Sequence, residues 1–183
     1  MFQGVNMQHR MLVLTLSGIL AVLSIPLVSA HGGESTSGPT NFQIMLISIG
    51  ISASIYFLIT RFLEIQTYLS SPLVFALASF TGSVHILLGL NEYLLLLGGV
   101  GIIGILGLSL FVNFSQWQDK IARLGLGLGV TVMFVAYFVS NHDIHYIIED
   151  YLGITTKLAE LSILILLKKE WKQETGHSAY HNK

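Results

Sequence analysis

The chain has 183 residues, of which 52% are hydrophobic and 10% are charged, whereas about a quarter of the residues in a soluble domain are charged. The mean hydropathy of +0.70 therefore indicates an integral membrane protein. The absence of cysteine excludes disulfides, thiolate metal sites and iron–sulfur clusters, and the net charge of −1 without a basic patch gives no reason to expect a nucleic-acid partner.

The N-terminal segment has the pattern of a secretory signal peptide. A polar stretch ends at Arg10, residues 11–28 are apolar with a break at Pro26, and small residues precede Ala30. We expect cleavage after Ala30, which makes residues 1–30 the signal peptide. The alternative is that this apolar segment is retained as a first transmembrane helix, which would give six spans.

Cleavage would make His31 the new N-terminus, so that its amine and its ring nitrogen could chelate one metal ion. This chelate resembles the histidine brace of copper proteins, which include polysaccharide monooxygenases, periplasmic copper carriers and the copper subunit of methane and ammonia monooxygenases. The resemblance covers His31 alone and implies copper. Residues 31–41 are rich in Gly, Ser and Thr and predict a flexible extracytoplasmic leader.

Five apolar segments follow, each close to the roughly 20 residues that span a hydrocarbon core. Because a backbone in lipid must satisfy its own hydrogen bonds, we expect an all-α integral membrane bundle of five transmembrane helices within residues 42–167. The expected segments are 42–60, 72–90, 93–113, 121–140 and 146–167. A two-residue turn at Asn91 and Glu92 predicts an antiparallel hairpin of the second and third helices. Residues 168–183 form a polar tail that we expect to be disordered.

The positively charged residues that flank the five apolar segments, or lie in the first turn of one, predict the orientation. On the five-helix topology all of them fall on one side, which is cytoplasmic by the positive-inside rule. They are Arg61, Lys120, Arg123, Lys168, Lys169 and Lys172. We therefore expect a multi-pass protein of the cell membrane with the mature N-terminus outside and the C-terminus in the cytoplasm.

Histidines and carboxylates gather at the outer face. In residues 141–150, His142, His145 and Glu149 would share one face of a helix, and Asp143 and Asp150 lie beside them. His85 lies about five residues below the outer end of the second helix, with Glu92 seven residues later. Imidazole and carboxylate without thiolate suit copper, zinc or iron. The candidate ligands are His85, His142, His145 and His31, with Glu92, Asp143 and Glu149 as alternative ligands or supporting acceptors.

Each of these residues also has a plainer interpretation. Residues 141–150 can be a polar loop, and His85 can be a neutral imidazole bonded to Ser83 or to a neighbouring helix. His85 can also be a proton carrier, or a ligand of haem b together with His142 or His145.

Lys157 and Glu160, at i and i+3 in the fifth segment, can form an intramembrane ion pair that acts as a relay, as a lock between helices, or only as a self-neutralised pair. His177 and His181 in the tail are expected to be solvated.

Glycines in the third and fourth segments predict close helix packing. Residues 99–104 match G-x-G-x-x-G, but no strand precedes them, so we reject a dinucleotide site. Gly98, Gly101, Gly104 and Gly107 instead form a row at intervals of three, and Gly125 and Gly129 form a G-x-x-x-G. We expect the row to face another helix, in this chain or in a partner subunit.

The hypothesis favoured by these patterns is a membrane protein with an extracytoplasmic His/carboxylate metal site, with copper preferred. It would act in copper handling or as a subunit of a copper-dependent membrane enzyme. The alternatives are a non-catalytic structural small subunit of a membrane complex and a b-haem electron carrier. The sequence has no hydrolase or phosphate-loop motif, and we expect no catalytic activity from the chain alone.

Overall fold

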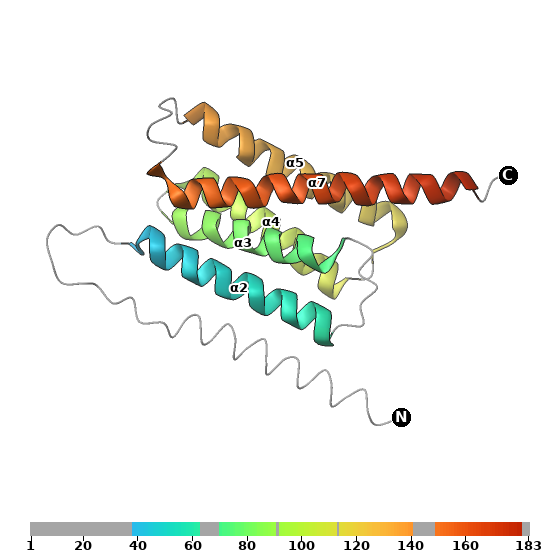
Figure 1. Ribbon diagram of the computed structural model, residues 1–183, viewed down its shortest axis with the longest axis horizontal. Coiled ribbons are helices and arrows are strands. Elements are labelled where there is room, and N and C mark those ends of the chain that lie inside the picture. The colour runs from blue at the N-terminus through green and yellow to red at the C-terminus, as the bar shows by residue number, and fades with distance from the viewer. Residues whose placement is uncertain (1–37, 63–69, 91, 113, 141–148, 181–183) are drawn as a thin grey trace, which may run out of the picture. The chain divides into compact units, whose positions relative to one another are not determined.

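The described part of the chain is entirely helical. A computed structural model describes residues 38–62, 70–90, 92–112, 114–140 and 149–180. They contain five helices, drawn in Figure 1: α2 (Asn41–Phe62), α3 (Pro72–Leu88), α4 (Tyr93–Phe111), α5 (Gln116–Ser140) and α7 (Tyr151–Tyr180). The all-α bundle that the sequence predicts is therefore observed for these residues.

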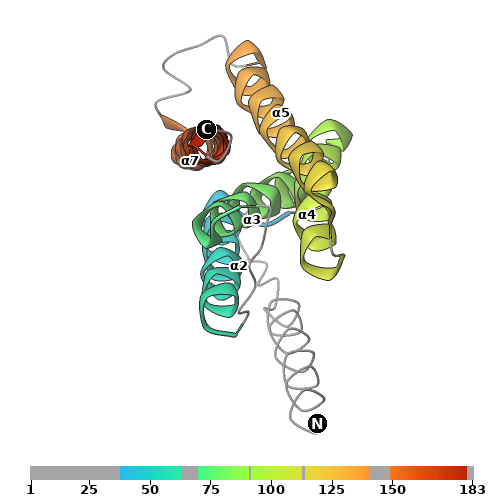
Figure 2. The same ribbon diagram turned by 90° about the vertical axis from the view of Figure 1, so that its right-hand side faces the viewer.

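Helix α3 lies at the centre of the bundle. It contacts α2, α4 and α7, while α5 packs against α4 and α7 (Figure 2). Eleven of its seventeen residues are buried, which explains why its sequence is apolar on nearly every side. Pro72 begins the helix, where a missing N–H breaks no helical hydrogen bond.

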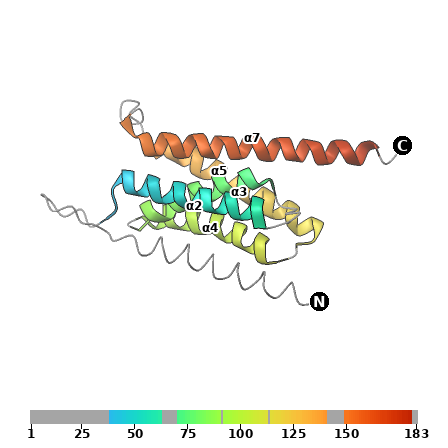
Figure 3. The same cartoon turned by 60° about the horizontal axis from the view of Figure 1, so that its bottom comes forward.

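Three of the described helices are long and apolar enough to cross a membrane, over Asn41–Arg61, Tyr93–Phe111 and Gln116–Ser140. Helix α3 is apolar but shorter, with 17 residues. Helix α7 has 30 residues, and Figures 1 and 3 show that its C-terminal part extends beyond the other helices. The tail expected to be disordered from residue 168 onward is therefore helical as far as Tyr180.

The α3–α4 hairpin is packed through glycine, although not through the predicted row. A Cβ atom on Gly99 would lie 2.7 Å from the main-chain oxygen of Gly82 and 2.7 Å from the nitrogen of Ile86. Only hydrogen fits there, so the two backbones approach closely.

The predicted glycine row behaves differently. Gly98 meets the side chain of Met133, but a Cβ on Gly101, Gly104 or Gly107 would find no atom of the described residues within 4 Å. Three residues fall about 60° short of a helical turn, so the four glycines wind through about 180° around α4 and do not all face one neighbour. Gly101, Gly104 and Gly107 therefore pack on no helix of the described chain, and their packing on a partner subunit stays a prediction.

Candidate functional site

A buried cluster of ionisable side chains joins α3, α5 and α7. Its centre is Glu160 of α7, whose exposed fraction is 0%. One carboxylate oxygen, Oε1, lies 2.8 Å from Nε2 of His85 and accepts the Thr81 hydroxyl at 3.0 Å. The other, Oε2, accepts a hydrogen bond from Nζ of Lys157 at 2.7 Å. Thr81 and His85 come from α3, so the carboxylate ties the two helices together.

Lys157 extends the cluster to α5. Its Nζ atom also donates to the main-chain oxygen of Met133 at 3.0 Å and lies 5.2 Å from the centre of the Tyr137 ring. The ring and the carbonyl both present negative charge to the ammonium group. Glu160 and Lys157 carry opposite formal charges, so the pair is neutral overall, and each ion has hydrogen-bonding partners in addition to the other. A buried pair needs such partners to offset the desolvation of both charges.

Tyr137 links this cluster to the beginning of α7. Its hydroxyl donates to Oδ2 of Asp150 at 3.0 Å. The other oxygen of Asp150 accepts the main-chain N–H of Gly153 at 2.9 Å, and its carbonyl accepts that of Ile154. Asp150 is therefore the N-cap of α7, where a carboxylate satisfies free backbone N–H groups and opposes the helix dipole. This role explains one of the carboxylates that the sequence places at the outer face.

His85 uses only one of its two ring nitrogens. Both carboxylate oxygens of Glu160 accept hydrogen bonds from other donors, so we assign the proton to Nε2, which then donates to Oε1. In this tautomer Nδ1 is an acceptor. It is buried and has no hydrogen-bond partner among the described residues. The imidazole is therefore held in one orientation, and no described residue uses the lone pair of Nδ1.

Most of the other candidate ligands cannot be placed beside it. His31, His142, Asp143 and His145 lie outside the described residues. Glu92 and Glu149 are both exposed, at the starts of α4 and α7. Within residues 38–62, 70–90, 92–112, 114–140 and 149–180, no group of three or more His, Asp or Glu side chains could hold a metal ion. The convergence of His85 with His142 and His145 stays a prediction.

The position of Glu160 along α7 shows how far the cluster lies from the predicted loop site. Glu160 is ten residues past Asp150, or about 15 Å along the helix. Residues 141–148 join the ends of α5 and α7.

Sequence reasoning missed three members of the cluster: Thr81, Tyr137 and the carbonyl of Met133. Nothing in the local sequence distinguishes them, because Thr and Tyr are ordinary residues of membrane helices. The i, i+3 spacing of Lys157 and Glu160 is enough to suggest that they form a pair. The partner of His85 cannot be predicted from the sequence, because it depends on which faces of α3 and α7 meet.

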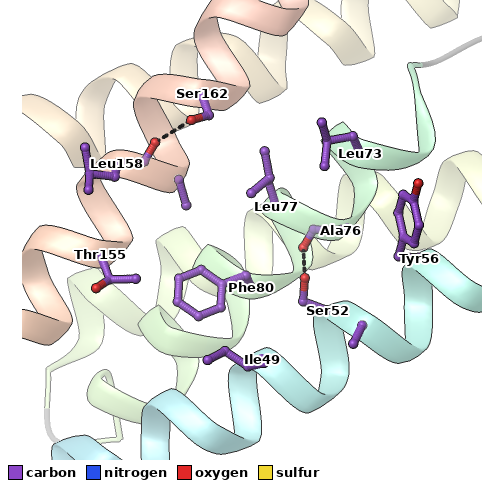
Figure 4. Close-up of a pocket in the computed structure, with 12 residues that line it drawn as sticks. Ile49, Ser52, Tyr56, Leu73, Ala76, Leu77, Phe80, Thr155, Leu158 and Ser162 are labelled. Carbon is purple, nitrogen blue, oxygen red and sulfur yellow. Dashed lines mark hydrogen bonds between the residues drawn. The ribbon is translucent and has the colours of Figure 1, made fainter.

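A groove of about 530 Å³ lies between α2, α3 and α7 on another side of α3 (Figure 4). The hydroxyl groups of its three Ser and Thr residues donate to main-chain carbonyls: Ser52 to Ala76, and Thr155 and Ser162 to the preceding turn of α7. Most of the other residues that line the groove are apolar, and none of its lining residues belongs to the buried cluster.

Comparison with known proteins gives no further indication of function. No family model, no curated protein and no solved structure matches the chain.

Proposed function

We propose that this chain is a multi-pass protein of the cell membrane that binds a metal ion, preferably copper, near its extracytoplasmic face, with His85 as the innermost ligand. It would have five spans after a cleaved signal peptide, with the N-terminus outside and the C-terminus in the cytoplasm. It would serve in copper handling or as a subunit of a copper-dependent membrane enzyme.

The observation that carries this proposal is the state of the His85 ring. A histidine that binds a metal usually donates its other N–H to a carboxylate, which fixes the tautomer and makes the free nitrogen a better ligand. The hydrogen bond between His85 and Glu160 has this form, and Nδ1 is buried without a partner among the described residues. Burying such a nitrogen costs free energy unless something occupies it.

The remaining ligands would come from residues that the sequence places on the same side. His142 and His145 lie between α5 and α7, and His31 would add an amine and an imidazole if it begins the mature chain. Intact mass of the purified protein tests the last point, because a chain that retains residues 1–30 has no free amine at His31. A nitrogen-rich site without thiolate suits Cu(II), and it also accommodates zinc or iron.

Elemental analysis and an absorption spectrum of protein purified in mild detergent test the proposal. We expect close to one metal ion per chain in the wild type and its loss in His85→Gln, since the Gln amide can donate to Glu160 but offers no ring nitrogen. His177→Gln, a histidine change in the tail, is the matched control and should retain the metal. Wild-type protein without metal under copper-replete growth would overturn the proposal, and a haem spectrum would replace it with the b-haem carrier.

A second candidate, a non-catalytic small subunit of a membrane complex, is favoured by a different observation. Gly101, Gly104 and Gly107 leave room beside α4, where Leu94 and Phe111 are 86% and 90% exposed. Small residues allow a partner helix to approach closely in lipid. Copurification of larger membrane subunits, lost in a Gly101→Leu/Gly104→Leu variant that still folds, would support this candidate.

A further inference from the structure

Helix α7 carries a cluster of basic residues where it leaves the bundle. Lys168, Lys169 and Lys172 follow the apolar segment that ends at Leu167, and all three are exposed. We propose that this cluster, together with Trp171, binds the phosphate headgroup of anionic lipids in the adjoining membrane leaflet. The proposal goes beyond the metal site and does not depend on it.

The one acidic residue within this stretch is directed back into the bundle. Glu170 accepts hydrogen bonds from the Ser70 hydroxyl at 2.5 Å and from the Ser71 main-chain N–H at 3.0 Å. Its carboxylate lies at the N-terminus of α3, where the helix dipole favours negative charge. Neither Lys168 nor Lys169 forms an ion pair with a described residue, so a phosphate can approach them without displacing a carboxylate.

The two hydrogen bonds of Glu170 indicate at which level of the membrane the basic cluster lies. Ser71 is the N-cap of α3, so Glu170 is level with the end of an apolar helix. Counting from Tyr151, a hydrocarbon core of about 30 Å corresponds to roughly 20 residues of α7, which also ends near residue 170. On the expected topology, with the hydrocarbon core beginning near Tyr151, both measures put the lysines at the level of the headgroups.

The spacing of the side chains suits a headgroup. Lys168, Trp171 and Lys172 stand at i, i+3 and i+4, so they share one side of the helix. Trp171 is 39% exposed, and an indole ring favours the boundary between acyl chains and headgroups. A lysine ammonium is a compact donor for phosphate oxygens. A basic segment beside a membrane span gains roughly fivefold in affinity for anionic lipid per lysine.

The test uses the full-length protein in lipid nanodiscs that contain phosphatidylcholine and a minor fraction of phosphatidylglycerol. Native mass spectrometry then measures how strongly phosphatidylglycerol is enriched among the lipids that remain bound. We expect enrichment in the wild type and at least a tenfold decrease in the Lys168→Gln/Lys169→Gln/Lys172→Gln variant, given the contribution of each lysine.

Arg61→Gln/Lys120→Gln is the matched control, because it removes two exposed cations on the same side from helices α2 and α5. This control should retain most of the phosphatidylglycerol enrichment, because Arg61 and Lys120 lie on helices other than α7. Equal loss in both variants would overturn a site on α7, and so would a wild type without preference for phosphatidylglycerol. If the lysine variant does not assemble into nanodiscs, the wild-type protein alone tests the proposal. Its enrichment of phosphatidylglycerol should fall steeply with added salt, and a preference that does not depend on salt contradicts the proposal.

Discussion

The Nε2 atom of His85 lies 2.8 Å from Oε1 of Glu160, although the two residues are 75 positions apart in the chain. Both side chains are almost completely buried, at 5% and 0% exposed. In an apolar environment neither could replace this partner with water. The contact therefore fixes the orientation of α3 relative to α7 and, through Lys157, that of α7 relative to α5.

Glu160→Ala should strongly destabilise the bundle. The change leaves the Lys157 ammonium buried without its carboxylate, and removing one partner of a buried pair costs about 3–5 kcal/mol. The double variant Lys157→Met/Glu160→Leu leaves no unpaired charge, so it should lose less stability than Glu160→Ala. Unfolding in detergent, followed by circular dichroism, measures both.

Glu92→Gln is the control for this comparison, because Glu92 is exposed and its substitution should leave stability within about 0.5 kcal/mol of the wild type. If the double variant is less stable than Glu160→Ala, then the contacts of Lys157 with the Met133 carbonyl and the Tyr137 ring stabilise the bundle by more than the unpaired ammonium destabilises it.

Gly99→Ala and Gly101→Ala should have opposite effects. The added methyl group on Gly99 meets the backbone of α3 at 2.7 Å, so the hairpin must separate, whereas Gly101 has open space. Alanine is a better helix former than glycine by about 1 kcal/mol, so Gly101→Ala should be neutral or stabilising. Midpoints of thermal unfolding of the two variants measure the difference. Equal destabilisation would mean that Gly101 is covered by a partner in the purified protein.

Individual residues show how far the sequence alone could lead. Runs of apolar residues place the helices well, and α3 ends at Leu88 and α4 begins at Tyr93, close to the expected break between these segments. The spacing of Lys157 and Glu160 suggests a pair because both lie on one helix. The contact between His85 and Glu160 could not be predicted, since hydropathy does not tell which faces of two apolar helices meet. The glycine row shows a related limit: its spacing indicates a smooth surface but does not tell whether a helix of this chain or of a partner covers it.

Asp150→Ala should weaken the start of α7 by about 0.5–2 kcal/mol, the range for losing an N-cap side chain. The substitution also removes the acceptor of the Tyr137 hydroxyl. Tyr137→Phe removes the same hydrogen bond and keeps the cap, so it should cost less. Hydrogen exchange at the amides of Gly153 and Ile154 should rise in Asp150→Ala and change little in Tyr137→Phe. Similar exchange in both variants would show that the link to Tyr137, rather than the cap, holds this end of the helix.

The last prediction is that the C-terminus lies in the cytoplasm. Helix α2 ends near Arg61, α5 begins near Lys120 and Arg123, and α7 continues into the basic cluster at residues 168–172. Positive charge thus lies at the ends of α2 and α7 and at the start of α5. On the expected topology these cations share one side of the membrane, and by the positive-inside rule that side stays in the cytoplasm during insertion. A fluorescent protein that matures only in the cytoplasm should be active when fused after Lys183, and alkaline phosphatase, which needs export, should be inactive there. An active phosphatase fusion would reverse the orientation and would place His85 nearer the cytoplasmic face, where the proposed extracytoplasmic metal site could not form.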